Sequence, residues 1–245
     1  MSHESAAITL SNDESLRARA EIFQLLKDYP GTAEETERSL GLFLRASLLS
    51  RLFGIRELYE KIVHIPGIVL DIGTWRGQTA VLCENLRAIL EPLNFTRRIV
   101  CFDTFEGYRG FSERDVPTEH HGEGTYHVGK SYARYLEKLL LLHEKSNAMG
   151  HNNGKHTVIA GDCRETIPSY FSDNSNDFIS LAFFDLNAYE PTEAAFDQVF
   201  RRLVPGGIIA FWQLARGKAV SAEGTFYTEK VLNTQSHSLH RSQFY

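Results

Sequence analysis

Cysteine, long apolar runs and excess positive charge are scarce in this sequence, and each shortage excludes a class of protein. The cysteines are odd in number and far apart, which fits neither a disulfide framework nor a zinc site and favours a reducing compartment: Cys83, Cys101 and Cys163. No run of about 18 apolar residues marks a membrane span. The first residues also lack the basic and apolar regions of a signal peptide. We therefore expect a cytoplasmic protein with no membrane partner.

The charge balance is mildly acidic, with 26 Lys and Arg residues against 31 Asp and Glu residues and a formal net charge of -5. Because no overall positive field attracts phosphates, nucleic acid is not an expected partner. The 245 residues, 42% of them hydrophobic, suffice for one large domain with a sizeable core. A small molecule is therefore the expected partner.

The sequence changes its texture near residue 65. Before this point, Leu and Phe recur at three- and four-residue steps, interrupted by a turn at residues 29–31, which predicts a helical N-terminal cap over residues 1–64. After it, short β-branched runs alternate with helical stretches over residues 78–90, 131–144 and 192–203. The runs cover residues 68–73, 98–105, 157–162, 179–186 and 207–214.

Strands that alternate with helices predict a mostly parallel sheet covered on both faces, a doubly wound α/β domain over residues 65–245. Ligands of such sheets bind at the carboxyl ends of the strands. The irregular segment 106–129 follows one of these ends, where a lid would be useful. Near the end of the chain, residues 225–232 predict a helix and residues 238–244 an antiparallel edge strand.

The strongest motif covers residues 69–80, VLDIGTWRGQTA, and runs from a buried strand through Asp71 into a glycine turn and a helix. Gly73 allows a sharp turn, and Gly77 allows the start of the helix to approach a ligand closely. The third glycine of the GxGxxG pattern is missing, which disfavours a nicotinamide-dependent oxidoreductase. A tight strand-to-helix connection without a ligand is the alternative.

Acidic residues follow three further strands. Asp103, in CFDTFEG, ends the second strand, where a carboxylate can accept both hydroxyls of a ribose, or cap a helix. Asp162, in AGDCR, can frame an adenine edge and can also cap a helix. Asp185, in FFDLNAYE, leaves an apolar strand toward the same crevice, a placement that packing does not explain.

Together these segments resemble class I S-adenosylmethionine-dependent methyltransferases. More narrowly, they resemble the macrocin O-methyltransferase-like family, which methylates sugar hydroxyls of antibiotics and their nucleotide-sugar precursors. The resemblance covers residues 60–215 and rests on DIGTWRG at 71–77, FDTFEG at 102–107, Asp185 with Tyr189, Glu190 and Thr192, and LVPGG at 203–207.

The resemblance implies S-adenosylmethionine as the cofactor. Asp71 and Gly73 would face its methionine part, Asp103 its ribose, and Phe105 and Asp162 the surroundings of its adenine. The full set of residues implied to bind the cofactor is Asp71, Gly73, Thr74, Trp75, Gly77, Thr79, Asp103, Thr104, Phe105, Gly161, Asp162, Cys163 and Asp185.

The sequence departs from this family at the metal site. The family has a second acidic residue two positions after the one at Asp185, and an acidic pair after the glycine-rich strand, which together hold a divalent metal. Here these positions are Asn187, Trp212 and Gln213, and a hard divalent cation needs several carboxylate oxygens. We therefore expect no metal requirement, with a weak magnesium site of Asp185, Asn187 and Gln213 as the alternative.

Without a metal, the acceptor hydroxyl must still lose its proton to a general base. Asp185 is the first candidate, and His120 and His121 in the predicted lid are alternatives because histidine titrates near neutral pH. A zinc site of His120, His121 and His127 lacks a spacing that fixes its geometry, and solvated loop histidines are the simpler interpretation.

The expected function is methyl transfer to a hydroxyl of a small molecule, a (nucleotide-)sugar or glycosylated natural product in antibiotic biosynthesis. The alternatives are a methyltransferase of a phenol or other non-sugar hydroxyl, and a cofactor-binding protein without sugar activity. The cap contains more leucine than one packing stripe needs, so we also expect a homo-oligomer formed through the N-terminal helices.

Overall fold

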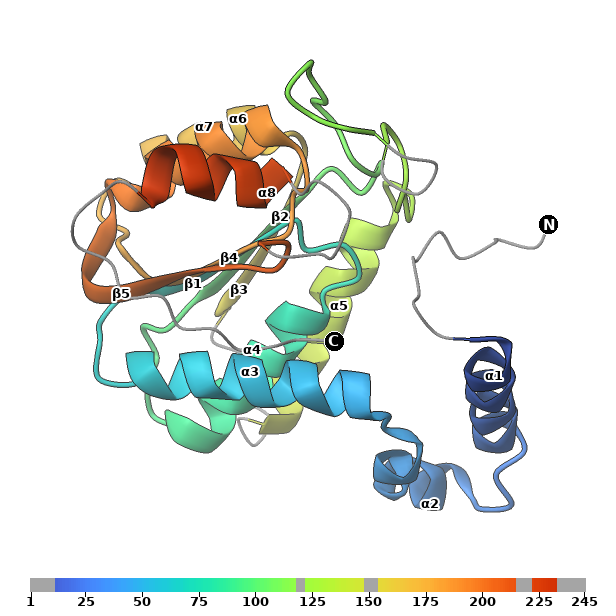
Figure 1. Ribbon diagram of the computed structural model, residues 1–245. Helices are drawn as coiled ribbons and strands as arrows, with labels where there is room; N and C mark the ends of the chain where they lie inside the picture. The colour runs from blue at the N-terminus through green and yellow to red at the C-terminus, as the bar shows by residue number, and fades with distance from the viewer. Residues whose placement is uncertain (1–11, 118–121, 148–153, 215–221, 233–245) are drawn as a thin grey trace. The chain divides into compact units, whose positions relative to one another are not determined.

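The computed structural model describes residues 12–117, 122–147, 154–214 and 222–232 (Figure 1). These residues divide into two compact units, residues 12–54 and residues 55–232. The predicted edge strand at 238–244 lies outside the described residues. No helix among the described residues is long and apolar enough to cross a membrane.

The first unit is helical. It contains α1 (Asp13–Lys27), α2 (Ala33–Arg38), the 3-10 helix η1 (Leu40–Phe43) and the first turns of α3 (Ala46–Ile62). The Asn12 side chain caps α1 by accepting the N–H of Ser15, and Thr32 and Glu35 form a capping box at α2. Among the described residues of α1, α2 and η1 none is buried, so these helices expose leucine and phenylalanine side chains.

The second unit is built on five parallel strands, which confirms the doubly wound α/β fold (Figure 1). The strands are β1 (Ile68–Ile72), β2 (Ile99–Asp103), β3 (His156–Ala160), β4 (Ile179–Phe184) and β5 (Leu203–Phe211), in the order β3-β2-β1-β4-β5. The chain moves outward from β1 to β3 and then returns to the other side of β1. Between β1 and β4 the winding therefore reverses, and open α/β sheets bind ligands at this position.

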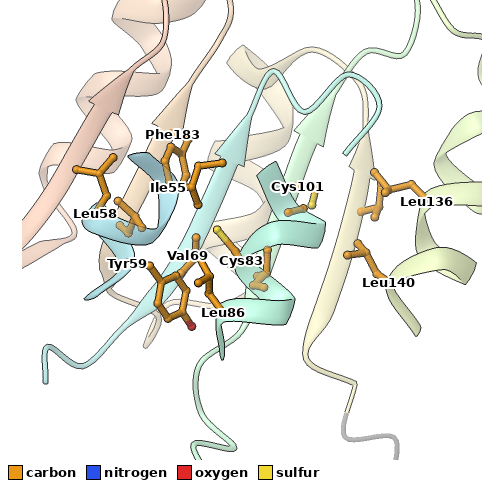
Figure 2. Packing of buried hydrophobic residues seen from close by; sticks show 14 of the residues in the cluster. Ile55, Leu58, Tyr59, Val69, Cys83, Leu86, Cys101, Leu136, Leu140 and Phe183 are labelled. Atoms are coloured by element: carbon orange, nitrogen blue, oxygen red, sulfur yellow. The ribbon is translucent and has the colours of Figure 1, made fainter. Parts of the chain in front are cut away.

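Helices cover both faces of the sheet. On one face, residues 55–62 of α3, together with α4 (Gln78–Leu90) and α5 (Tyr132–Asn147), pack against strand residues such as Val69 and Phe183 (Figure 2). On the other face, α6 (Cys163–Asp173) and α7 (Tyr189–Phe200) pack against Leu70 and Phe184. Successive strand residues point to opposite faces, so the same apolar runs supply both cores.

Two short helical elements, α8 and η2, complete the unit. The helix α8 (Ala222–Phe226) packs against α7 and continues into the π-helix η2 (Tyr227–Val231).

The sequence pattern does not predict α6, because Pro168 interrupts its helical pattern. Asp162 is the N-cap of this helix and accepts the N–H of Arg164 at 2.9 Å, so the capping interpretation of Asp162 is confirmed.

Buried ion pairs strengthen the packing of α4. Glu84, which is fully buried, bonds to Arg87 and lies 2.7 Å from Nε2 of His156 at the start of β3. Burial alone would raise the pKa of Glu84, but the hydrogen bonds from His156 and Arg87 outweigh it and lower the pKa. At the end of α4, Glu91 forms a second buried pair with Arg97. The contact of Glu84 with His156 and the pair of Glu91 with Arg97 hold α4 against the rest of the second unit, whereas the pair of Glu84 with Arg87 lies within the helix.

Candidate active site

The loops at the carboxyl ends of the strands contain strained backbone. Trp75 follows β1, Phe105 follows β2 and Asn187 follows β4, and all three have positive φ angles of 50–55°. Tyr126, in the segment 106–129, has a φ of 66°. Left-handed backbone costs energy in residues other than glycine and collects at ligand sites. The strained residues therefore lie at the carboxyl edge of the sheet, where the strand order also predicts a ligand site.

The two glycines of the motif, Gly73 and Gly77, lie where a side chain would clash with a neighbouring segment. A Cβ atom on Gly73 would lie 2.3 Å from the carbonyl oxygen of Asp185, so glycine allows the end of β1 to run close to the loop after β4. A Cβ atom on Gly77 would lie 2.2 Å from a methyl group of Leu136. Glycine is therefore needed here for the packing of α5, and the approach of a ligand to Gly77 stays a prediction.

Asp103 links two of the strained loops. Its Oδ2 accepts the N–H of Trp75 and its Oδ1 accepts the N–H of Phe105, each at 2.6 Å. Burial raises the pKa of Asp103, the two N–H groups lower it, and the nearby charge of Asp185 raises it again, with a net increase. The residue caps no helix among the described residues, so the helix N-cap alternative is not the role seen.

The neighbours of Asp103 in the second loop are turned inward. The Thr104 hydroxyl donates to the carbonyl oxygen of Gly107 at 2.7 Å. Phe105 is only 1% exposed and its ring lies near that of Tyr132. Both residues therefore shape the loop after β2, and contact between them and a cofactor remains a prediction.

Three of the residues implied to bind the cofactor are buried behind the glycine turn: Asp71, Thr74 and Thr79. The Thr74 hydroxyl donates to the carbonyl oxygen of Asp71 at 2.7 Å. Burial and then the charge of Asp71 raise the pKa of the enclosed Cys101 thiol. Trp75, in contrast, is 42% exposed, so its ring is accessible to a ligand.

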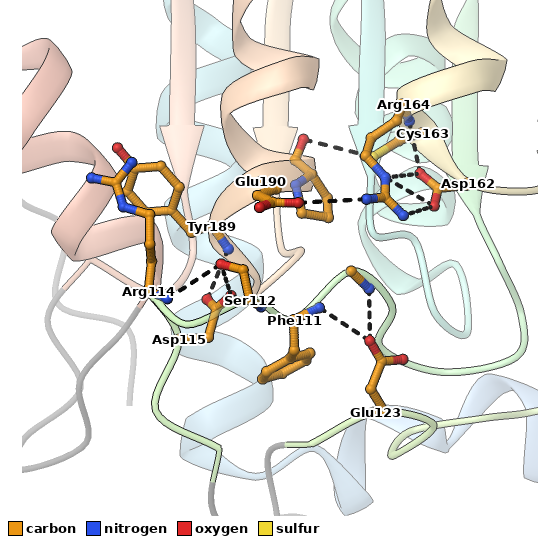
Figure 3. Close-up of polar contacts among 12 residues, drawn as sticks. Phe111, Ser112, Arg114, Asp115, Glu123, Asp162, Cys163, Arg164, Tyr189 and Glu190 are labelled. Carbon is orange, nitrogen blue, oxygen red and sulfur yellow. Dashed lines mark hydrogen bonds and ion pairs between the residues drawn. The ribbon is translucent and has the colours of Figure 1, made fainter.

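Arg164 covers the Asp162 carboxylate (Figure 3). Its guanidinium donates to both carboxylate oxygens, with Nη2 at 2.6 Å from Oδ2, and these bonds lower the pKa of Asp162. The next residue, Cys163, is buried and its thiol contacts the carbonyl oxygen of Pro191, while burial raises its pKa to about 12. Gly161, which precedes Asp162, has a φ of 143°. The carboxylate that the sequence predicts to frame an adenine edge is therefore paired with Arg164 in this structure.

Asp185, Gln213 and Glu223 meet at the ends of β4 and β5. Nε2 of Gln213 donates to Oδ1 of Asp185 at 2.7 Å. The fully buried carboxylate of Glu223, from α8, accepts the backbone N–H of Gln213 at 3.0 Å and that of Leu186 at 2.8 Å. Sequence reasoning misses Glu223 because no local motif surrounds it and its partners lie 10 to 37 positions away.

Polar contacts tie residues 106–117 to α7 and η2 (Figure 3). Oδ1 of Asp115 accepts the N–H of Tyr189 at 2.9 Å. The Arg114 guanidinium lies 3.6 Å from the centroid of the Tyr189 ring and pairs with Glu229, which also accepts the Tyr189 hydroxyl. These contacts hold the segment at the start of α7, close after Asp185.

The segment also carries aromatic side chains toward the glycine turn. The ring of Tyr126 packs edge-on against Trp75, with 5.7 Å between centroids, and lies 5.2 Å from the ring of Tyr108. The carboxylate of Glu123 supports this region by accepting the N–H groups of Gly110 and Phe111 (Figure 3). A row of aromatic rings therefore borders the exposed side of the candidate site.

The predicted histidine alternatives lie largely outside the described residues. His120 and His121 fall in the gap at 118–121, and His127 is exposed. Within the residues that the structure describes, no group of three His, Cys, Asp or Glu side chains could hold a metal ion.

Comparison with solved structures identifies proteins that are similar to most of this chain. The crystal structure of CalS11, a calicheamicin methyltransferase, is 31% identical in sequence to this chain. Its TM-score is 0.86, and the match covers 95% of this chain and 91% of that chain. A second, apo structure of CalS11, described as a TDP-rhamnose 3′-O-methyltransferase, gives 30% identity and a TM-score of 0.77 over 91% and 87%. The O-methyltransferase NovP, at 18% identity and a TM-score of 0.52 over 67% and 64%, shares the fold. A search of curated protein sequences finds no significant match.

The family model described as a methyltransferase domain matches residues 70–211. This range begins inside β1, ends with β5, and contains the glycine turn, Asp103, Asp162 and Asp185. The chain therefore belongs to the methyltransferase-domain family and is a methyltransferase.

Proposed function

We propose that this protein transfers a methyl group from S-adenosylmethionine to a hydroxyl of a sugar, as a nucleotide-sugar or within a glycosylated natural product of antibiotic biosynthesis. The observation that carries the proposal is the similarity to CalS11, a TDP-rhamnose 3′-O-methyltransferase by its description, over 95% of this chain. A match over 95% of the chain is longer than the methyltransferase-domain range of residues 70–211 and therefore extends beyond that domain.

The residues at the carboxyl edge of the sheet fit the cofactor. Each oxygen of Asp103 accepts one backbone N–H and keeps a lone pair for one ribose hydroxyl. The Gly73 turn brings β1 against the loop of Asp185, and the exposed Trp75 ring borders the site. When bound, S-adenosylmethionine supplies a methyl group activated by a sulfonium. The protein then has to align the acceptor, exclude water and remove a proton.

Asp185 is the proposed general base. It directly follows the buried strand β4, and Gln213 fixes its carboxylate by donating to Oδ1. A carboxylate oxygen of Asp185 would take the proton of the acceptor hydroxyl as the methyl group is transferred. The aromatic row of Trp75, Tyr126 and Tyr108 offers ring faces to the apolar side of a sugar.

A divalent metal fits this site poorly, and we propose a metal-independent reaction. The side chain of Gln213 presents an N–H group, not an oxygen, to Asp185. The fully buried Glu223 carboxylate already accepts three backbone N–H groups, so a cation would have to compete with these bonds for its oxygens. One carboxylate with amide neighbours is a weak donor set for a hard cation.

The homo-oligomer and the cytoplasmic location belong to the same proposal. In α1 and η1, Phe23 is 57% exposed and Leu42 is 72% exposed, and such apolar surface is typical of an interface between subunits. The three cysteines are free thiols and are buried, which supports a reducing compartment.

The experiment combines calorimetry with a methyl-transfer assay. We expect S-adenosylhomocysteine to bind and NAD not to bind, and we expect turnover with TDP-deoxysugars. Asp185→Asn should lower kcat by about 10²–10⁴-fold and leave the Kd of S-adenosylhomocysteine nearly unchanged, because only the proton acceptor is lost. Turnover of phenols but not sugars would contradict the acceptor class, and cofactor binding without any turnover would favour a binding protein.

A further inference from the structure

Glu223 is a buried carboxylate that the proposed reaction does not use. It lies in the first turn of α8 and is fully buried. Its Oε1 accepts the N–H of Leu186 at 2.8 Å and that of Asn187 at 3.3 Å, and its Oε2 accepts the N–H of Gln213 at 3.0 Å. All three donors are backbone amides, so the carboxylate faces the main chain on both oxygens.

The three amides belong to two different loops. Leu186 and Asn187 follow β4 directly after Asp185, and Gln213 follows β5. One carboxylate therefore joins the loop that carries the proposed base to the loop that carries its hydrogen-bond donor. Asn187 has a φ of 50°, a strained conformation that needs support from its surroundings, and its N–H is one of the three groups that Glu223 holds.

Packing alone does not account for a carboxylate at this position. Burial and the charge of Asp185 raise the pKa of Glu223 to about 8, although the three N–H groups act in the opposite direction. Two other residues of α8, Ala222 and Phe226, already pack against Tyr189 in an apolar cluster. Burying a carboxyl group is costly unless it is hydrogen-bonded, and here the backbone N–H groups of Leu186, Asn187 and Gln213 supply these bonds.

We propose that Glu223 is a positioning residue for methyl transfer. It holds the loops after β4 and β5 together, so that the side-chain amide of Gln213 keeps its hydrogen bond to Oδ1 of Asp185. This inference rests on the proposed role of Asp185 as the base. Glu223 touches neither acceptor nor cofactor in this role, and its effect on the reaction passes through Asp185.

The first test is a double-mutant cycle with Asp185. Glu223→Gln keeps one acceptor oxygen and places an NH₂ group against the backbone amides, so kcat should fall about tenfold, and Glu223→Ala should lower it about 100-fold. The Kd of S-adenosylhomocysteine should change less than about twofold in Glu223→Gln. In an Asp185→Asn background, Glu223→Gln should lower the residual rate by less than about twofold, because the residue through which it acts is already disabled.

The matched control is Glu91→Gln. Glu91 is also a buried, hydrogen-bonded carboxylate, but it lies at the end of α4, away from the carboxyl edge of the sheet. This variant should lose stability and keep its kcat at a temperature at which it is fully folded. An equal loss of kcat in Glu91→Gln and Glu223→Gln, or the same cost of Glu223→Gln with and without Asp185, would overturn the positioning role.

The second test needs no acceptor. In Glu223→Gln, amide hydrogen exchange should accelerate at Leu186, Asn187 and Gln213, while the amide of Trp75, bonded to Asp103, should keep its protection. Unchanged exchange at the three amides would overturn the proposal. If Asp185→Asn keeps full activity, the base assignment and the positioning role built on it both fail. A wild-type protein inactive on sugars with accelerated exchange would refute only the proposed acceptor.

Discussion

Replacing Asp103 tests the cofactor site most directly. Both of its oxygens are already held by backbone N–H groups, of Trp75 and Phe105, at 2.6 Å. Each carboxylate oxygen has two lone pairs, so one acceptor position per oxygen remains, which matches the two hydroxyls of a ribose. A hydrogen bond to a charged group contributes about 1.5–3 kcal/mol. In Asp103→Ala, water takes over part of these bonds, and we expect a net loss of about 2–3 kcal/mol.

This loss corresponds to a Kd for S-adenosylhomocysteine that is about 30- to 150-fold higher, measured by isothermal titration calorimetry. The matched control is Asp177→Asn at the amino end of β4, where the carboxylate accepts the hydroxyl of Tyr170 and should not affect the cofactor. The pKa of Asp103 is raised by burial and the nearby Asp185 charge. Affinity should therefore begin to fall at a higher pH than for an ordinary aspartate as the solution is acidified.

A ligand without the 2′-hydroxyl separates a direct contact from an effect on the loops. The wild-type protein should bind the 2′-deoxy analogue of S-adenosylhomocysteine more weakly than the parent, and Asp103→Ala should bind both equally. If Asp103→Ala binds S-adenosylhomocysteine within about threefold of the wild type, the ribose assignment is refuted. If it binds weakly but still distinguishes the two ligands, Asp103 supports the loops and another group holds the hydroxyl.

Three further predictions concern the ion pairs, the metal and the N-terminal helices. Glu84→Gln should lower the free energy of unfolding by about 3–5 kcal/mol, because it leaves the buried Arg87 unpaired. Because folding lowers the pKa of Glu84, the extra stability of the wild type should be present above the unfolded-state pKa and should vanish as the pH falls through the folded-state pKa. A stability difference in urea titrations that stays constant at all pH values would contradict this. Methyl transfer should survive exhaustive treatment with a chelator, whereas activity lost with chelator and restored by magnesium would make Asp185 a ligand. Sedimentation should show an oligomer at micromolar concentration that dissociates when Phe23 and Leu42 are both changed to Glu, and a monomeric wild type would exclude this interface.

Local sequence determines a large part of this molecule. The apolar run that ends in Asp71, followed by Gly73, specifies β1 and its turn, because a buried strand and a left-handed φ of 83° leave little choice of residue. Five such runs, separated by helical stretches, are sufficient to predict a parallel doubly wound sheet. The acidic residues at the strand ends follow from the same pattern, since parallel strands bring their carboxyl ends to one edge.

The tertiary structure alone decides what depends on contacts between distant segments. The sequence predicts a ligand near Gly77, and only the folded chain shows that Leu136 on α5, 59 positions away, also requires glycine there. The partners of Asp103 and the cover of Arg164 over Asp162 depend on how loops fold back, which no periodicity encodes. Glu223 looks like any polar residue near the end of the chain until α8 packs beside the sheet. Folding buries the Glu223 carboxylate and brings three backbone N–H groups to it, and the hydrogen bonds to these groups replace those to water. Both the burial and the partners are properties of the folded chain, so the local sequence does not reveal them.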